Sequence, residues 1–107
     1  MMHILRVLKG SDTVLRVPFD HHADLTGFEA WMQIRKSKSN EVVLDELTTE
    51  NKRISIGHGC FCLSFPHEIT ENWSFRRGLF DIKAISPDGG EVRMAEGKIL
   101  VIPGVTR

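Results

Sequence analysis

The stretch from Gly78 to Val101 constrains the fold more than any other, because it spells out a strand, a tight turn and a second strand. Phe80, Ile82 and Ala84 alternate with polar residues, which is the period of two expected of a half-buried strand. The segment Ser86–Gly90 then supplies the proline, aspartate and glycines that chain reversals favour. The stretch predicts a β-hairpin for which the rest of the chain must supply partner strands.

The second half of this hairpin changes phase. Val92 and Met94 continue the alternation on even positions, whereas Ile99 and Val101 fall on odd positions. Gly97 lies near the change, and a glycine at a one-residue slip is typical of a β-bulge. The sequence therefore predicts a bulge at Gly97.

Similar alternation predicts six shorter strands before the hairpin. They span residues 4–8, 12–19, 28–35, 41–47, 54–56 and 60–65. The first is expected to be an edge strand, and the fourth to place Val42 and Leu44 on one face. After Pro66 the segment 67–73 fits one helical turn that crosses between sheets. We expect an all-β protein, a single β-sandwich domain over residues 1–107, with about seven to nine short strands.

Length and charge exclude several classes of protein. The 107 residues suit one domain, and 41% hydrophobic content is enough for a core. The 14 basic and 14 acidic residues cancel, so no basic field exists to attract nucleic acid or anionic lipid. No apolar run approaches the roughly 20 residues that span a bilayer. We therefore expect no nucleic-acid partner and no membrane partner, and use in a cytoplasm.

One cluster could suggest a metal. His58, Cys60 and Cys62 share a face of the predicted strand, with His67 nearby, and zinc accepts such ligands. The spacing lacks the tight turn between ligands and the second ligand pair of structural zinc sites. The alternative is that both cysteines are small, semi-apolar free thiols opposite the core face, and we expect no metal. A disulfide between positions two apart on one strand is not expected.

A second polar group lies in a loop. His21 and His22, flanked by Asp20 and Asp24, could form a metal or acid–base site, but no second cluster with ligand spacing accompanies them. No recognisable catalytic signature surrounds any serine or cysteine. We expect no catalytic residues, no cofactor-binding residues and no enzyme.

Aromatic residues are the better candidates for function. Trp31, Trp73 and Phe75 form a candidate contact surface, because exposed aromatics favour partner surfaces and sugar-stacking platforms. Trp31 lies on the polar face of its strand. For Trp73 the alternative is a core position, since it lies four residues from Ile69.

Short motifs along nearly the whole chain resemble a family of small tailed-phage and prophage proteins with immunoglobulin-like β-sandwich folds. The motifs are Gly10-Ser11-Asp12-Thr13, Ala23-Asp24-Leu25-Thr26-Gly27, Gly78-Leu79-Phe80-Asp81, Glu96-Gly97-Lys98 and Val105-Thr106-Arg107. The order and spacing of these motifs carry the resemblance. The chain departs from it at Phe80, where the family more often has a tyrosine whose hydroxyl could anchor the crossover loop.

The resemblance implies an immunoglobulin-like antiparallel β-sandwich that serves as a virion structural or adaptor protein, such as a tail, fibre or baseplate adaptor. Its partners would be other virion proteins and copies of itself in a symmetric assembly. Its location would be the virion, after assembly in the cytoplasm of a bacterial host. The alternative is a small ligand-binding or carbohydrate-binding module that uses Trp31 and a neighbouring loop.

Overall fold

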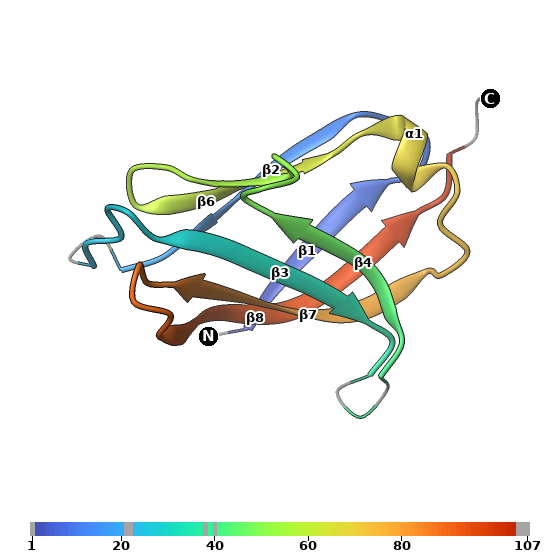
Figure 1. Cartoon of the computed structure of the whole chain (residues 1–107). Coiled ribbons are helices and arrows are strands. Elements are labelled where there is room, and N and C mark those ends of the chain that lie inside the picture. The colour runs from blue at the N-terminus through green and yellow to red at the C-terminus, as the bar shows by residue number, and fades with distance from the viewer. Residues whose placement is uncertain (1, 21–22, 38, 40, 105–107) are drawn as a thin grey trace.

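The computed structural model describes residues 2–20, 23–37, 39 and 41–104, which form two packed β-sheets and one short helix (Figure 1). The elements are β1 (Met2–Leu8), β2 (Thr13–Pro18), β3 (Glu29–Arg35), β4 (Val43–Thr48), β5 (Ile54–Ile56), β6 (Cys60–Phe65), α1 (His67–Thr70), β7 (Arg77–Ile85) and β8 (Glu91–Ile102). This order confirms the predicted all-β class, the hairpin and the helical turn. In the described part of the chain, no helix has the length and hydropathy needed to cross a membrane.

The strands divide into a five-stranded sheet, in the order β1-β8-β7-β3-β4, and a three-stranded sheet, in the order β2-β6-β5. The segment that carries α1 joins the two sheets, as predicted. Neighbouring strands are antiparallel except β1, which pairs parallel with β8 at the edge of the larger sheet. The hairpin β7–β8 therefore lies in the middle of the larger sheet, with β1 on one side and β3 on the other.

The core lies between the sheets and follows the alternation of the sequence. In β6, Phe61, Leu63 and Phe65 are fully buried, and they alternate with half-exposed neighbours. β3 and β7 bury every second residue in the same way. Because successive strand residues point to opposite faces, each of these strands presents one apolar face to the core and one polar face to water.

The predicted bulge exists, but its predicted position at Gly97 is wrong. The register between β7 and β8 shifts opposite Ile82 and Lys83, and Met94 is the extra residue on β8. From Ala95 onward the odd positions of β8 point inward. The bulge thus lies three residues before the glycine, because any residue that accepts the bulge geometry can occupy it.

Gly97 has a different role, which is close packing against the neighbouring strand. It pairs in register with Phe80 on β7 and with His3 on β1. A Cβ atom at Gly97 would lie 2.7 Å from the carbonyl carbon and 2.8 Å from the nitrogen of His3, and closer still to its carbonyl oxygen. Its φ angle is not positive, so the glycine is required by space and not by backbone strain.

The prediction that Val42 and Leu44 share one face of a strand is also wrong. Val42 precedes β4 and is 64% exposed, while Leu44 packs partly against the core. A register shift near Arg35 skips Leu44 in the pairing of β3 with β4. This irregularity changes the phase of β4, so that Leu47 is its buried residue.

Two sets of polar contacts tie the sheets together. Arg53, before β5, makes a two-pronged ion pair with Asp45 of β4, with both nitrogen–oxygen distances 2.8 Å. At the other end, the backbone N–H of Gly10 donates to the buried Thr70 hydroxyl at 3.0 Å, so the β1–β2 turn lies against α1 (Figure 1). The crossover loop is thus anchored without the tyrosine hydroxyl that Phe80 replaces.

Candidate binding face

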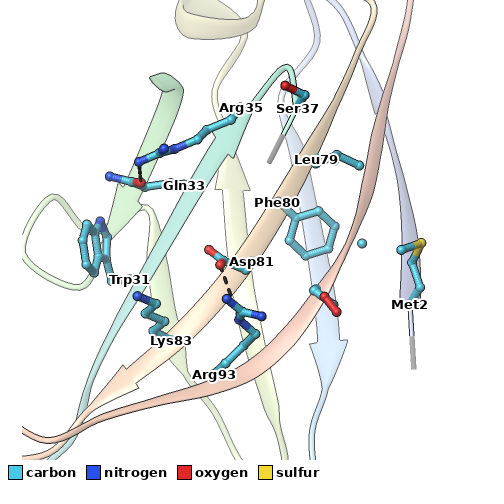
Figure 2. Close-up of a pocket in the computed structure, with 12 residues that line it drawn as sticks. Met2, Trp31, Gln33, Arg35, Ser37, Leu79, Phe80, Asp81, Lys83 and Arg93 are labelled. Carbon is cyan, nitrogen blue, oxygen red and sulfur yellow. Dashed lines mark hydrogen bonds and ion pairs between the residues drawn. The ribbon is translucent and has the colours of Figure 1, made fainter. Parts of the chain in front are cut away.

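The outer face of the five-stranded sheet carries a groove and a chain of side-chain hydrogen bonds. We call it the Trp31 face: it consists of the solvent-side residues of β3, β7 and β8 with Glu46 of β4 and Met2 of β1. A shallow groove of about 310 Å³ runs across it (Figure 2). The groove is lined by Met2, Trp31, Gln33, Arg35, Ser37, Leu79, Phe80, Asp81, Lys83, Arg93, Glu96 and Gly97.

A chain of hydrogen bonds holds one side of this face. The Trp31 indole N–H and the Gln33 amide both donate to Oε2 of Glu46 at 2.8 Å, and the Arg35 guanidinium donates to the Gln33 oxygen at 2.9 Å. The two bonds from Gln33 and Trp31 lower the pKa of Glu46 below its ordinary value. The carboxylate therefore stays ionised at neutral pH and fixes the indole in one orientation.

Charged side chains continue across the sheet beside Trp31. The Lys83 ammonium lies 5.5 Å from the centre of the indole ring and 3.4 Å from a carboxylate oxygen of Glu91. Arg93 lies 3.6 Å from an Asp81 oxygen (Figure 2). The signs alternate along β7 and β8, but across the two strands Lys83 lies opposite Arg93 and Asp81 lies opposite Glu96, so both ion pairs are diagonal.

The structure separates the three aromatic residues predicted as a contact surface. Trp31 lies on the outer face of β3 with its ring half-buried. Trp73 is only 6% exposed and packs edge-on against Phe65, with ring centres 5.8 Å apart. Phe75 lies 4.7 Å from Trp73, also packed against the core, and is partly buried. Of the three aromatic residues, only Trp31 therefore lies on the broad outer face of the five-stranded sheet.

The two cysteines lie opposite the core face of their strand, as predicted for small, semi-apolar free thiols. Cys60 and Cys62 are half-buried free thiols on the outer face of the three-stranded sheet. Burial, followed by the hydrogen bond with Cys62, raises the pKa of the Cys60 thiol, which disfavours the thiolate that zinc requires. Within the described residues, His58 does not join the two cysteines in a three-ligand group.

One other cluster of metal-ligand types is found among the described residues. Asp12, His67 and Glu68 place one ligand atom each within 4.8 Å of one another, and all three side chains are exposed. The His67 backbone N–H donates to Asp12 at 2.8 Å, and its Nδ1 lies 2.9 Å from the same oxygen. These contacts attach α1 to the β1–β2 turn, which is a structural role. The polar loop at His21 and His22, where the sequence did not favour a metal or acid–base site, lies outside the described residues.

Sequence reasoning identified Trp31 but missed the side chains that neighbouring strands bring to it. Alternation predicts that Gln33 and Arg35 share the face of Trp31, and the structure confirms it. Glu46 and Lys83 come from β4 and β7, on either side of β3. Their proximity depends on strand order and register, which no local pattern encodes.

No protein-family model and no curated protein matches this sequence. Solved structures do match it. One of them is the structure of the NK cell receptor Nkp44, described as a triggering partner in natural cytotoxicity. It superposes with a TM-score of 0.55 and 16% sequence identity, over 94% of this chain and 98% of that chain. A likeness at this identity shows the fold alone.

The chain therefore has an immunoglobulin-like β-sandwich fold, as predicted. The larger sheet carries β4 beyond β3, in the place of one of the two strands that variable-type domains add to this sheet. Two common features of antibody domains differ. Both cysteines lie on β6, so no disulfide joins the sheets, and Trp31 points away from the core while Trp73 of the crossover fills it.

Proposed function

We propose that this protein is a structural or adaptor component of a tailed-phage or prophage virion, and that it acts through protein–protein contacts in a symmetric assembly. The support for a virion role is the resemblance of its ordered short motifs, of which Val105-Thr106-Arg107 lies outside the described residues. In this proposal the partners are other virion proteins and copies of the chain, and assembly takes place in the bacterial host cytoplasm. The protein is proposed to work by binding and not by catalysis.

The observation that carries the proposal is the ordered Trp31 face. Tryptophan and arginine are enriched among the residues that dominate binding energy at protein interfaces. Here Glu46 holds the indole by a 2.8 Å hydrogen bond before any partner arrives. A side chain that is already fixed loses less conformational freedom on binding, so more of its contact energy contributes to affinity.

The charges around Trp31 supply selectivity. Lys83 and Arg93 lie opposite each other on β7 and β8, and each forms a partly exposed ion pair with a diagonal carboxylate, Glu91 for Lys83 and Asp81 for Arg93. A partner with a complementary pattern could exchange these weak surface pairs for buried ones, whereas a mismatched partner would meet like charges. The proposed mechanism is therefore an aromatic anchor set in a charge pattern that selects the partner.

The alternative function is carbohydrate binding in the same groove. A flat indole ring beside amide and carboxylate groups favours it, because such rings stack on sugars. However, the Lys83 ammonium already lies over the Trp31 ring, and Glu46 uses the indole N–H. A sugar would have to displace the lysine, so we favour the protein–protein role.

The test is complex formation with the proteins encoded by the genes on either side of this one. Each is co-expressed with the wild-type chain, and complexes are measured by size-exclusion chromatography with light scattering. We expect a defined complex that Trp31→Ala weakens by about tenfold or more, the loss of one central interface residue. The matched control is Val14→Ala, which changes a 69% exposed residue on the opposite sheet.

The outcomes separate the two functions. Failure to form any complex with the neighbouring proteins, together with absence from purified virions by mass spectrometry, would contradict the virion role. A glycan array that binds the wild-type chain and loses its signal with Trp31→Ala would favour the carbohydrate alternative. Equal weakening by Trp31→Ala and Val14→Ala would show that the Trp31 face is not the contact.

A further inference from the structure

The strand β1 leaves an apolar edge on the larger sheet. It pairs with β8 on one side, and it is the outermost strand of the sheet order. Met2, Ile4 and Leu8 are 52%, 54% and 42% exposed, and Ile102, the register partner of Leu8, is 42% exposed. Half of the large hydrophobic side chains that are exposed in the described part of the chain therefore gather along this one edge.

The other sheet edges carry features that discourage pairing with another chain. The edge strand β4 has Asp45 and Glu46 and a register irregularity, β2 ends in Pro18, and β5 is three residues long. Charges, prolines, bulges and short length are the usual means of protecting an edge. β1 has only one of them, the charge of Arg6: it is seven residues long, contains no proline and is in continuous register with β8.

We propose that β1 pairs antiparallel with β1 of a second copy of this chain, with the two-fold axis at Leu5. In this register Met2 faces Leu8 of the other copy, and Ile4 faces its Arg6, by the sequence of β1. The charged Arg6 thus meets an apolar residue and never another arginine. Like charges directly opposite each other destabilise a strand pair, so this register, in which no two arginines meet, allows β1 to pair with a copy of itself.

The pairing deepens the proposed function, on which it rests, by naming a partner and a geometry. A two-fold axis perpendicular to the paired strands joins the two five-stranded sheets into one continuous sheet. Both Trp31 faces then lie on the same side of that sheet. The dimer would present two identical contact faces to the next component of a symmetric assembly, which raises the apparent affinity through bivalency.

The proposed register makes a prediction about charge at Ile4. Ile4→Lys places a lysine opposite Arg6 of the other copy twice in each dimer, whereas Ile4→Glu places a carboxylate there twice. Opposite charges across antiparallel strands stabilise the pair and like charges destabilise it. We therefore expect Ile4→Lys to raise the dimer dissociation constant by about tenfold or more, and Ile4→Glu to leave it within about threefold of the wild type.

The measurement is sedimentation velocity of the purified chain from micromolar to millimolar concentration, with thermal melts to show that each variant is folded. The control is Val92→Lys, a residue of the same chemistry and similar exposure, 52%, at the far end of β8. It should leave the dimer unchanged. The double variant Ile4→Lys with Arg6→Glu should restore the dimer, because it recreates the opposite-charge pairs.

Three results would overturn the inference. One is a wild-type chain that remains monomeric at every concentration, without concentration-dependent amide hydrogen-exchange protection in β1. Another is equal weakening by Ile4→Lys and Ile4→Glu, which would contradict the register. The third is a dimer that Trp31→Ala abolishes and that neither Ile4 variant affects: self-association through the Trp31 face would then agree with the proposed function while the β1 pairing fails.

Discussion

Because β8 approaches β1 closely at Gly97, the substitution Gly97→Ala tests whether the packing of these two strands requires a glycine at this position. The added methyl would lie 2.7 Å from the carbonyl carbon of His3, where ordinary van der Waals contact begins at 3.4 Å. The two strands must therefore separate by at least 0.7 Å at this point, and further to clear the carbonyl oxygen. The obstacle is backbone, which cannot move aside as a flexible side chain could.

Two limits bound the loss in the free energy of unfolding that Gly97→Ala causes. Overpacking that the structure absorbs by small shifts costs about 1–3 kcal/mol. If β1 detaches instead, the burial of Leu5 and Val7, which are 7% and 0% exposed, is lost, at about 1.5–3 kcal/mol for each side chain. Alanine also restricts the unfolded chain, which offsets about 0.4–1 kcal/mol. We expect a net loss of about 2–4 kcal/mol in the free energy of unfolding.

Urea denaturation followed by tryptophan fluorescence measures this loss, because Trp73 is buried in the core. Two other glycines separate the causes. Gly57→Ala should change little, since its nearest neighbours would be 3.4 Å away and its φ is not positive. Gly10→Ala should cost about 1–2 kcal/mol through its φ of 83° alone, since nothing lies within 4 Å. A Gly97→Ala protein as stable as Gly57→Ala, or with hydrogen-exchange protection lost outside β1 and β8, would refute the reasoning.

Two further substitutions test the contacts between elements. Arg53→Met leaves the Asp45 carboxylate, whose side chain is 12% exposed, without its ion partner. We expect a loss of about 2–4 kcal/mol in the free energy of unfolding by urea denaturation, and the double variant with Asp45→Leu should recover much of it. His67 has a pKa raised above 6.5, chiefly by its hydrogen bond with Asp12, whose own pKa is lowered below 3.8 mainly by the hydrogen bond from the His67 backbone N–H. The stability that protonated His67 contributes is complete below pH 6.5 and is lost as the pH rises through the pKa of His67 in the folded state. The stability that ionised Asp12 contributes is lost as the pH falls through the folded-state pKa of Asp12. Melting temperatures should therefore fall more for the wild type than for His67→Gln between about pH 5.5 and pH 8.5, and equal slopes would contradict this linkage.

Much of the fold was predictable because strand alternation is a local signal. Phe61, Leu63 and Phe65, and likewise Ala30, Met32 and Ile34, are buried as their period of two predicts. The errors occurred where one residue shifts the phase. Met94 carries the bulge assigned to Gly97, and the irregularity near Arg35 moves Val42 off the strand face. A phase shift depends on which residue opposes which, and the neighbouring strand is not visible in a local pattern.

The candidate site was predictable only in part, for the same reason. Trp31 could be recognised as an aromatic on a polar strand face, but Glu46 and Lys83 reach it from strands on either side. Trp73 takes the core position that its spacing from Ile69 offered as the alternative, and Phe75, predicted only as a contact residue, also packs partly against the core.

By itself, the sequence determined the β-sandwich class, the positions of most strands and the inward faces of the best-patterned ones, because alternation and turn residues act over a few neighbouring positions. The tertiary structure decided the parallel pairing of β1 with β8, the requirement for glycine at position 97 and the assembly of the Trp31 face. These features join residues far apart in the chain, and they arise only when strand order and register bring those residues into contact.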